Sequence, residues 1–182
     1  MTIMRLMERL RAVRLEKERV ALSLLSLSLF AILYALGALA SPIPWRPALL
    51  ALALCYGLGF FALASQWFWA RWFVLGLAWS GATLGLASLV MVGWHPFLAL
   101  YGGLHALVLV LLAGPPMVLR FEMQTQWRER YAMDEFAVAR LGRIVTRAST
   151  ALPSLIMWAL APREGQGAWG LAFLGMTCAL AG

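Results

Sequence analysis

The sequence contains no asparagine, a single lysine and two cysteines, and its four longest apolar runs carry no charged residue. Runs without Asp, Glu, Lys or Arg argue against a proton-coupled carrier, a charge-lined channel or a carboxylate-based intramembrane enzyme, because each needs such groups at depth. Cys55 and Cys178 lie inside apolar runs without a CxxC spacing, which indicates small hydrophobic side chains. The scarcity of lysine and asparagine indicates a GC-rich bacterial genome.

Sequence motifs for chemistry are missing as well. The chain has no zinc-binding motif, no Ser-His-Asp order, no phosphate-binding glycine loop and no Asp-rich motif for lipid headgroup transfer. We therefore expect a protein that is not an enzyme, with no catalytic residue and no metal site.

The composition is that of a membrane protein. Hydrophobic residues make up 63% of the 182 residues and charged residues 13%, which is too apolar for an ordinary soluble domain. The net charge of +7 comes mainly from arginine. Because the basic residues gather in two clusters rather than along a stripe, we expect contact with anionic lipids and no binding of nucleic acid.

Residues 20–119 are predicted to form an all-α bundle of four transmembrane helices. The apolar runs cover 20–40, 48–65, 73–92 and 97–119, and about twenty residues are enough to cross a hydrocarbon core of roughly 30 Å. Ala38-Leu39-Ala40 resembles a signal-peptide cleavage site, but the first run is longer than the usual stretch of about 7–15 residues, so a retained span is expected. Pro115 and Pro116 should kink or unwind the end of the fourth helix.

Two amphipathic segments flank this bundle. Residues 1–19 form a predicted cytoplasmic interfacial helix, whose apolar stripe comprises Ile3, Leu6, Met7, Leu10 and Val13. Residues 120–148 form a second cytoplasmic segment, in which a helix starts near Asp134 and lies along the membrane surface. Its aliphatic face contains Ala137, Val138, Leu141, Ile144, Val145 and Ala148. Arg140, Arg143 and Arg147 lie on the opposite face, where they would contact anionic lipid or a protein partner.

Residues 149–182 contain two apolar runs, 149–162 and 168–182, separated by a short polar turn. Each is shorter than the roughly 17–25 residues that a straight span requires. They form either a re-entrant apolar hairpin or, if the preceding surface helix continues without a break, a fifth span.

The distribution of basic residues predicts the orientation. Six lie before the first run and six between Arg120 and Arg147, whereas Arg46 and Arg71 stand alone in the turns. Two clusters separated by four spans lie on one side, which the positive-inside rule makes cytoplasmic. We therefore expect a protein of the bacterial inner membrane with its amino terminus in the cytoplasm.

His105 is the candidate cofactor-binding residue. It lies deep in the fourth run, where a neutral imidazole could ligate haem b or a chlorophyll, and Gly102 and Gly103 would leave room for a flat macrocycle. A more common use of such a histidine is a hydrogen bond across helices, here to the serine row of Ser23, Ser26 and Ser28.

Gly81 and Gly85 form a GxxxG motif in the third run, which lets another backbone approach closely. Packing within the chain is the more common use of such a motif, and a contact with a partner is the alternative.

A short segment resembles the cytoplasmic coupling segment of ABC-importer permeases. Glu135-Phe136-Ala137 is followed by Gly142 and by Leu152-Pro153, as an EAA triplet is followed by a glycine and a proline in that family. Both spacings differ by one residue, and Val138 stands where the second alanine is expected. The resemblance covers residues 135–153 and implies coupling to a cytoplasmic ATPase.

The sequence thus favours a non-catalytic accessory or scaffolding subunit of a bacterial inner-membrane complex. Its partners would be other membrane-protein subunits and anionic lipids. The alternatives are a redox or light-harvesting subunit that binds a tetrapyrrole through His105, and a permease subunit coupled to an ATPase through residues 120–148.

Overall fold

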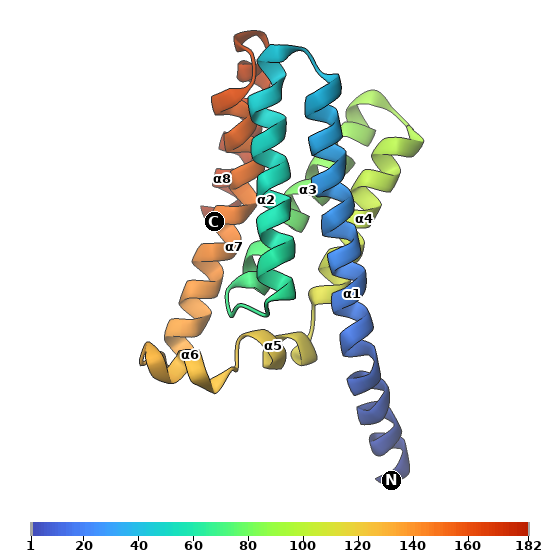
Figure 1. The fold of residues 1–182 in the computed structure, drawn as a ribbon, viewed down its shortest axis with the longest axis vertical. Coiled ribbons are helices and arrows are strands. Elements are labelled where there is room, and N and C mark those ends of the chain that lie inside the picture. Colours follow the sequence, from blue (N-terminus) through green and yellow to red (C-terminus); the bar gives the residue numbers. More distant parts are fainter. Residues whose placement is uncertain (1, 182) are drawn as a thin grey trace.

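The computed structural model describes residues 2–181, and it describes the side chains of residues 15–164, 166–176 and 178. The described part of the chain is all helical (Figure 1). Its elements are α1 (Thr2–Ala40), the short turn η1 (Ile43–Trp45), α2 (Arg46–Ala64), α3 (Ala70–Val92), α4 (Pro96–Leu112), α5 (Pro115–Phe121), α6 (Thr125–Arg130), α7 (Glu135–Leu160) and α8 (Arg163–Ala181).

Within the described residues, three helical segments are long and apolar enough to cross a membrane: Leu15–Ala40, Ile43–Ala64 and Ala70–Val92. Helices α4 and α5 are together apolar enough for a fourth span, but they are bent by 75° at the break between them, so this span would be a broken one. The predicted kink at the two prolines is therefore confirmed. The sequence predicts four spans, and the described residues contain three candidate spans, or four if α4 and α5 are counted together. These apolar helices are compatible with insertion into a membrane.

The long helices run side by side, and the short ones close one end (Figure 1). Helix α1 packs against α2 and α4, α3 packs against both α4 and α7, and α8 returns along α7. The α2–α3 turn, α5 and α6 lie at the end of the bundle from which the N-terminal part of α1 projects. Helix α3 also contacts α2 and α5, so four helices pack around it and it is the central helix of the described chain.

Helix α1 continues without a break from Thr2 to Ala40. Residues 2–19 of the segment predicted as an interfacial helix are therefore helical and run directly into the first apolar run. Its apolar stripe, Ile3, Leu6, Met7, Leu10 and Val13, lies outside the residues whose side chains are described.

Helix α7 differs from the predicted surface helix. It crosses the expected boundary at residue 148 without a break and stands upright against α3. Val138 and Gly142 are buried because they face the indole of Trp72 on α3. This contact divides the predicted aliphatic face, since Ile144 remains 55% exposed. Helix α7 runs from the predicted surface segment into the first C-terminal apolar run, and α8 packs back along it; among the described residues neither helix is a candidate membrane span.

Small residues allow α3 to approach α7 closely. A Cβ atom on Gly76 would lie 2.5 Å from the carbonyl oxygen of Thr146 and would overlap the side chain of Ser149. A Cβ atom on Gly142 would lie 2.7 Å from the Trp72 ring. Backbone atoms cannot yield in the way that a flexible side chain can, so larger residues at these positions would separate the two helices.

We expect Gly76→Leu to destabilise the fold by about 3 kcal/mol or more, because overpacking costs typically 1–3 kcal/mol even where neighbours can shift. The matched control is Gly103→Leu on α4, where a Cβ atom meets nothing within 4 Å. Thermal unfolding in mild detergent, followed by circular dichroism, measures both variants. Equal melting temperatures for the two would show that α3 and α7 do not pack as described.

Candidate functional site

His105 lies at the centre of a buried polar cluster in the apolar part of the bundle. Its side chain is 1% exposed. Nε2 lies 2.8 Å from the hydroxyl of Tyr56, and Nδ1 lies 2.8 Å from the carbonyl oxygen of Tyr101. A carbonyl only accepts hydrogen bonds, so Nδ1 carries the proton of the neutral ring and Nε2 accepts from the Tyr56 hydroxyl. Both ring nitrogens are thereby satisfied within the chain.

The imidazole ring packs tightly against Phe30 and Gly81. The Phe30 ring stacks on it with a centroid distance of 3.8 Å and an interplanar angle of 25°. Gly81 of α3 lies against the ring so closely that a Cβ atom at this position would overlap it. The aromatic wall comes from α1 and the glycine from α3, so the site forms only when both helices pack on α4.

A pair of tyrosine hydroxyls lies next to the Tyr56–His105 hydrogen bond. The hydroxyls of Tyr34 and Tyr101 are 2.8 Å apart. The ring of Tyr34 stacks on that of Tyr56 with a centroid distance of 5.4 Å. The cluster therefore joins α1, α2 and α4 through polar groups that each find a partner in an apolar environment.

The serine row suggested by the sequence does not contact His105. Ser23, Ser26 and Ser28 donate instead to carbonyl oxygens of their own helix, at 2.9, 3.0 and 2.8 Å. The sequence contains a signal for the true partners, because three of its four tyrosines, at positions 34, 56 and 101, lie within apolar runs. A hydroxyl at such a depth needs a hydrogen-bond partner, and a buried imidazole supplies one.

The surroundings of His105 do not fit a tetrapyrrole. The Nε2 atom, which would ligate the metal, accepts a hydrogen bond, and Phe30 and Gly81 occupy the space beside the ring. Gly102 packs on Gly85, so it leaves no gap for a macrocycle. Among the described residues no group of three or more His, Cys, Asp and Glu side chains could hold a metal ion.

Gly81 and Gly85 are both buried against α4 of the same chain. A Cβ atom on Gly85 would lie 2.6 Å from the Cα atom of Gly102. The GxxxG motif therefore serves packing within the chain. The alternative predicted from the sequence is that these two glycines contact a partner. In the structure both glycines contact α4 of the same chain, and neither is exposed.

A charged cluster closes the end of the bundle where α4 breaks. Pro115 and Pro116 have no N–H group, so the carbonyl oxygens of Leu111 and Leu112, four residues earlier, lose their helical donors. Arg19 of α1 donates from Nε to Leu111 at 2.7 Å, and Arg71 of α3 donates from Nε to Leu112 at 2.9 Å.

Arg71 also forms an ion pair with Glu122, which directly follows α5. The two side chains are 11% and 12% exposed. Since Arg71 belongs to α3, this pair fastens the bent α5 segment to the central helix. The contact thus holds the two arms of the broken helix at their angle.

The outer face of α7 carries a row of exposed basic residues. Arg140, Arg143 and Arg147 are all exposed. Phe136, 72% exposed, and Ile144, 55% exposed, accompany them. The opposite face of the helix packs on α3, so this surface of cations and apolar side chains is held in place by the bundle.

The segment that resembles a permease coupling segment is part of α7. Asp134 caps the helix, since its Oδ1 accepts from the backbone N–H of Ala137 at 2.7 Å. Gly142 packs on Trp72, and Pro153 lies inside the helix. The glycine and the proline therefore contribute to packing rather than to a turn between two helices.

Comparisons of the chain with protein-family models, with curated proteins and with solved structures found no match.

We expect Tyr56→Phe to destabilise the protein by about 1–3 kcal/mol, because the acceptor Nε2 of His105 would be left buried without a donor. The control is Tyr131→Phe, whose parent side chain is 57% exposed, so its loss should cost less than about 0.5 kcal/mol. Thermal unfolding in mild detergent measures the difference. Similar melting temperatures for both variants would argue against the Tyr56–His105 hydrogen bond.

We expect Glu122→Gln to destabilise the protein by about 1–3 kcal/mol, because Arg71 would retain a largely buried charge without its counter-ion. This loss of stability is smaller than that expected for breaking a fully buried ion pair, since both side chains keep some solvent contact. The matched control is Glu129→Gln, which changes an exposed carboxylate on α6. If both variants melted at the same temperature, the ion pair would not be what fastens α5.

Proposed function

We propose that this protein is a non-catalytic accessory or scaffolding subunit of a bacterial inner-membrane complex. In this proposal α1, α2, α3 and the broken α4–α5 unit form four membrane spans. Helices α7 and α8 pack beside them as a further helical pair. The subunit holds its neighbours through its helices and through the cytoplasmic end of α7.

The exposed face of α7 is the observation that carries this proposal. Three arginines and two large apolar side chains share one surface, and none of them contributes to the core of the chain. Aromatic and aliphatic side chains next to arginines are typical of contact surfaces between proteins. Their counterpart would be an acidic and apolar surface on another subunit, with anionic lipid headgroups around it.

The buried polar groups support a structural role. His105 is hydrogen-bonded at both nitrogens, and Arg71 is paired with Glu122. These groups join helices of the same chain, as expected of a polar cluster that specifies packing.

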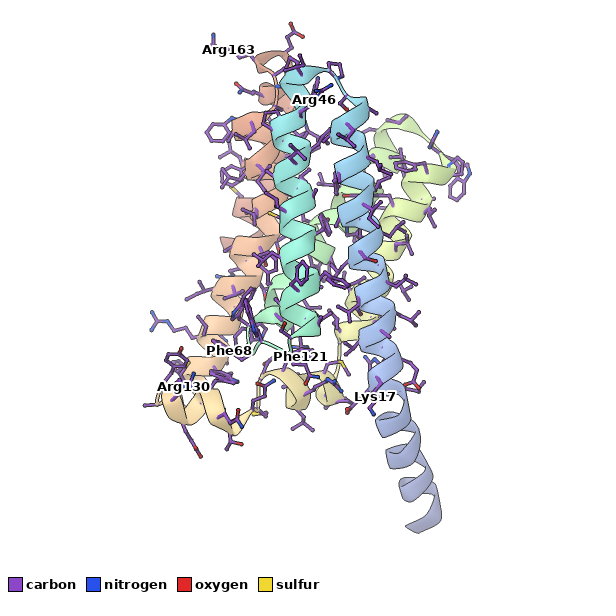
Figure 2. All side chains as sticks on the ribbon, in the orientation of Figure 1. Lys17, Arg46, Phe68, Phe121, Arg130 and Arg163 are labelled. Carbon is purple, nitrogen blue, oxygen red and sulfur yellow. The ribbon has the colours of Figure 1, made fainter. Side chains whose placement is uncertain are left out.

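The charge distribution supports the proposed orientation. Figure 2 shows Lys17 and Arg130 at the end of the bundle that holds the α2–α3 turn, and Arg46 and Arg163 at the other end. Arg71 in the first turn of α3, Arg120 on α5, and Arg140 and Arg143 in the first half of α7 belong to the first end as well, whereas Arg147 lies about halfway along α7. The positive-inside rule places this richer end, and with it the N terminus, in the cytoplasm.

The alternative hypotheses make different predictions. A tetrapyrrole-binding subunit would show a visible absorption band that His105→Ala abolishes, although the enclosed imidazole gives it no support. A permease subunit would lose the coupling of ATP hydrolysis when Arg140 and Arg143 are changed to glutamate. The continuous α7 helix offers no turn comparable with a coupling segment.

The proposal predicts that the triple variant Arg140→Glu, Arg143→Glu and Arg147→Glu loses its partner subunits, because a basic contact surface becomes acidic and repels an acidic partner. The measurement is affinity purification from native membranes in mild detergent, with the amounts of co-purifying subunits quantified by mass spectrometry. We expect a decrease of at least about tenfold, which corresponds to roughly 1.4 kcal/mol.

The matched control is Arg163→Glu, an exposed arginine at the opposite end of the bundle. It should retain the partners of the parent protein, and both variants should melt at the parent temperature. If the triple variant kept stoichiometric partners, or if the parent protein had none, the proposed scaffolding role would be wrong.

A further inference from the structure

A cavity of about 310 Å³ lies beside the buried tyrosines. Six helices contribute to its wall: α1, α2, α3, α4, α7 and α8. Most of the lining side chains are apolar, among them Leu33, Leu49, Leu84, Leu98, Met157 and Trp169. The volume is at the lower end of the range of about 300–1,000 Å³ that is usual for small-molecule sites.

The polar groups of the wall are hydroxyls. Tyr34 and Tyr101, whose hydroxyls are 2.8 Å apart, both line the cavity, as does Ser88. Among the described lining residues there is no Asp, Glu, Lys, Arg or His. A charged headgroup would find no counter-ion here, whereas an uncharged oxygen would find a hydroxyl able to donate or accept.

We propose that this cavity binds an uncharged membrane-soluble lipid through a single carbonyl or hydroxyl group, which hydrogen-bonds to the Tyr34–Tyr101 pair. The apolar remainder of the ligand contacts the leucines and Met157. This binding site goes beyond the proposed scaffolding function, which requires no ligand.

The tyrosine pair is held ready for such a ligand. The ring of Tyr34 stacks on Tyr56, and the hydroxyl of Tyr56 is fixed by its hydrogen bond to His105. The backbone of Tyr101 is fixed as well, since its carbonyl accepts from His105. A site whose polar groups are already ordered loses less conformational entropy when its ligand binds.

The cavity and the buried cluster therefore use the same residues. The carbonyl oxygen of Tyr101 accepts from the histidine, its hydroxyl pairs with that of Tyr34, and both tyrosines line the cavity. Two features, the partly open apolar cavity and the hydrogen-bonded hydroxyl pair, thus point to one class of ligand.

Photo-crosslinking of the full-length protein in nanodiscs tests the proposal. Three diazirine-bearing probes of similar length are compared: a ubiquinone analogue with a short tail, a long-chain alcohol, and an alkane without oxygen. Mass spectrometry locates the adducts, and competition with the unlabelled compound gives the half-saturating concentration. We expect saturable labelling near Leu84 and Met157 by at least one oxygen-bearing probe and none by the alkane.

Gly37→Leu should reduce the saturable labelling at least about tenfold, because the leucine side chain would occupy the cavity. Gly37 lines the cavity, and its Cβ atom would lie 3.9 Å from Leu49, an ordinary contact that the fold tolerates. Gly103→Leu, the same change at an open position of α4, is the matched control and should label as the parent does.

Tyr34→Phe with Tyr101→Phe should raise the half-saturating concentration of the oxygen-bearing probes about tenfold, since the ligand loses a hydrogen bond. The melting temperatures of all variants are measured in parallel, and the Tyr34→Phe single variant replaces the double variant if the latter unfolds.

Labelling by the quinone analogue alone would identify a carbonyl acceptor, and labelling by the alcohol alone would identify a hydroxyl; both results support the proposal. Two results would overturn it. One is equal saturable labelling by the alkane with no effect of the tyrosine variants, which would mean that ordinary lipid chains fill the cavity. The other is labelling that does not saturate with any probe.

Discussion

The carbonyl oxygens of Leu111 and Leu112 must find donors outside their own helix, because the residues four positions later are prolines. The side chains of Arg19 and Arg71 provide these donors from two different helices. This requirement draws α1 and α3 to the same point of α4. Through Glu122 it also holds α5 across the end of the bundle. The charged end of the molecule thus depends on a break in an apolar helix.

Close packing makes the centre of the bundle similarly constrained. Helix α3 presents Gly76 to α7 and Gly81 to α4, and neither position has room for a Cβ atom. On the side facing α4, the imidazole of His105 lies against Gly81, and both of its ring nitrogens form hydrogen bonds within the chain. In an apolar environment such a satisfied polar cluster favours one packing arrangement over others, because any alternative would leave a donor or an acceptor unpaired.

The close packing of the helices leaves two separate surfaces on which this chain could bind other molecules. The interior faces of the helices are committed to packing, so a partner protein has only the outer surface to contact. On α7 this surface combines arginines with Phe136 and Ile144. The cavity beside Tyr34 and Tyr101 is different in kind, because it is a partly open recess whose described lining residues are uncharged and come from helices in both halves of the chain. A protein partner and a lipid ligand would therefore use separate parts of the molecule.

The sequence by itself determined the helical class, the apolar segments and the kink at Pro115 and Pro116, because these depend on local composition and on the missing N–H groups of proline. It also revealed the basic row on α7, since residues three and four apart share a helix face.

The tertiary structure alone decided the partners of His105 and the position of α7. Tyr56 lies 49 residues from His105 along the chain, and no periodicity relates two such positions. The amphipathic pattern of α7 suits a membrane surface and a bundle equally well. It was the fit of Gly142 against Trp72, a contact between distant segments, that placed the helix upright. Contacts of this kind depend on shape complementarity between helices, which a single sequence does not encode in its local pattern.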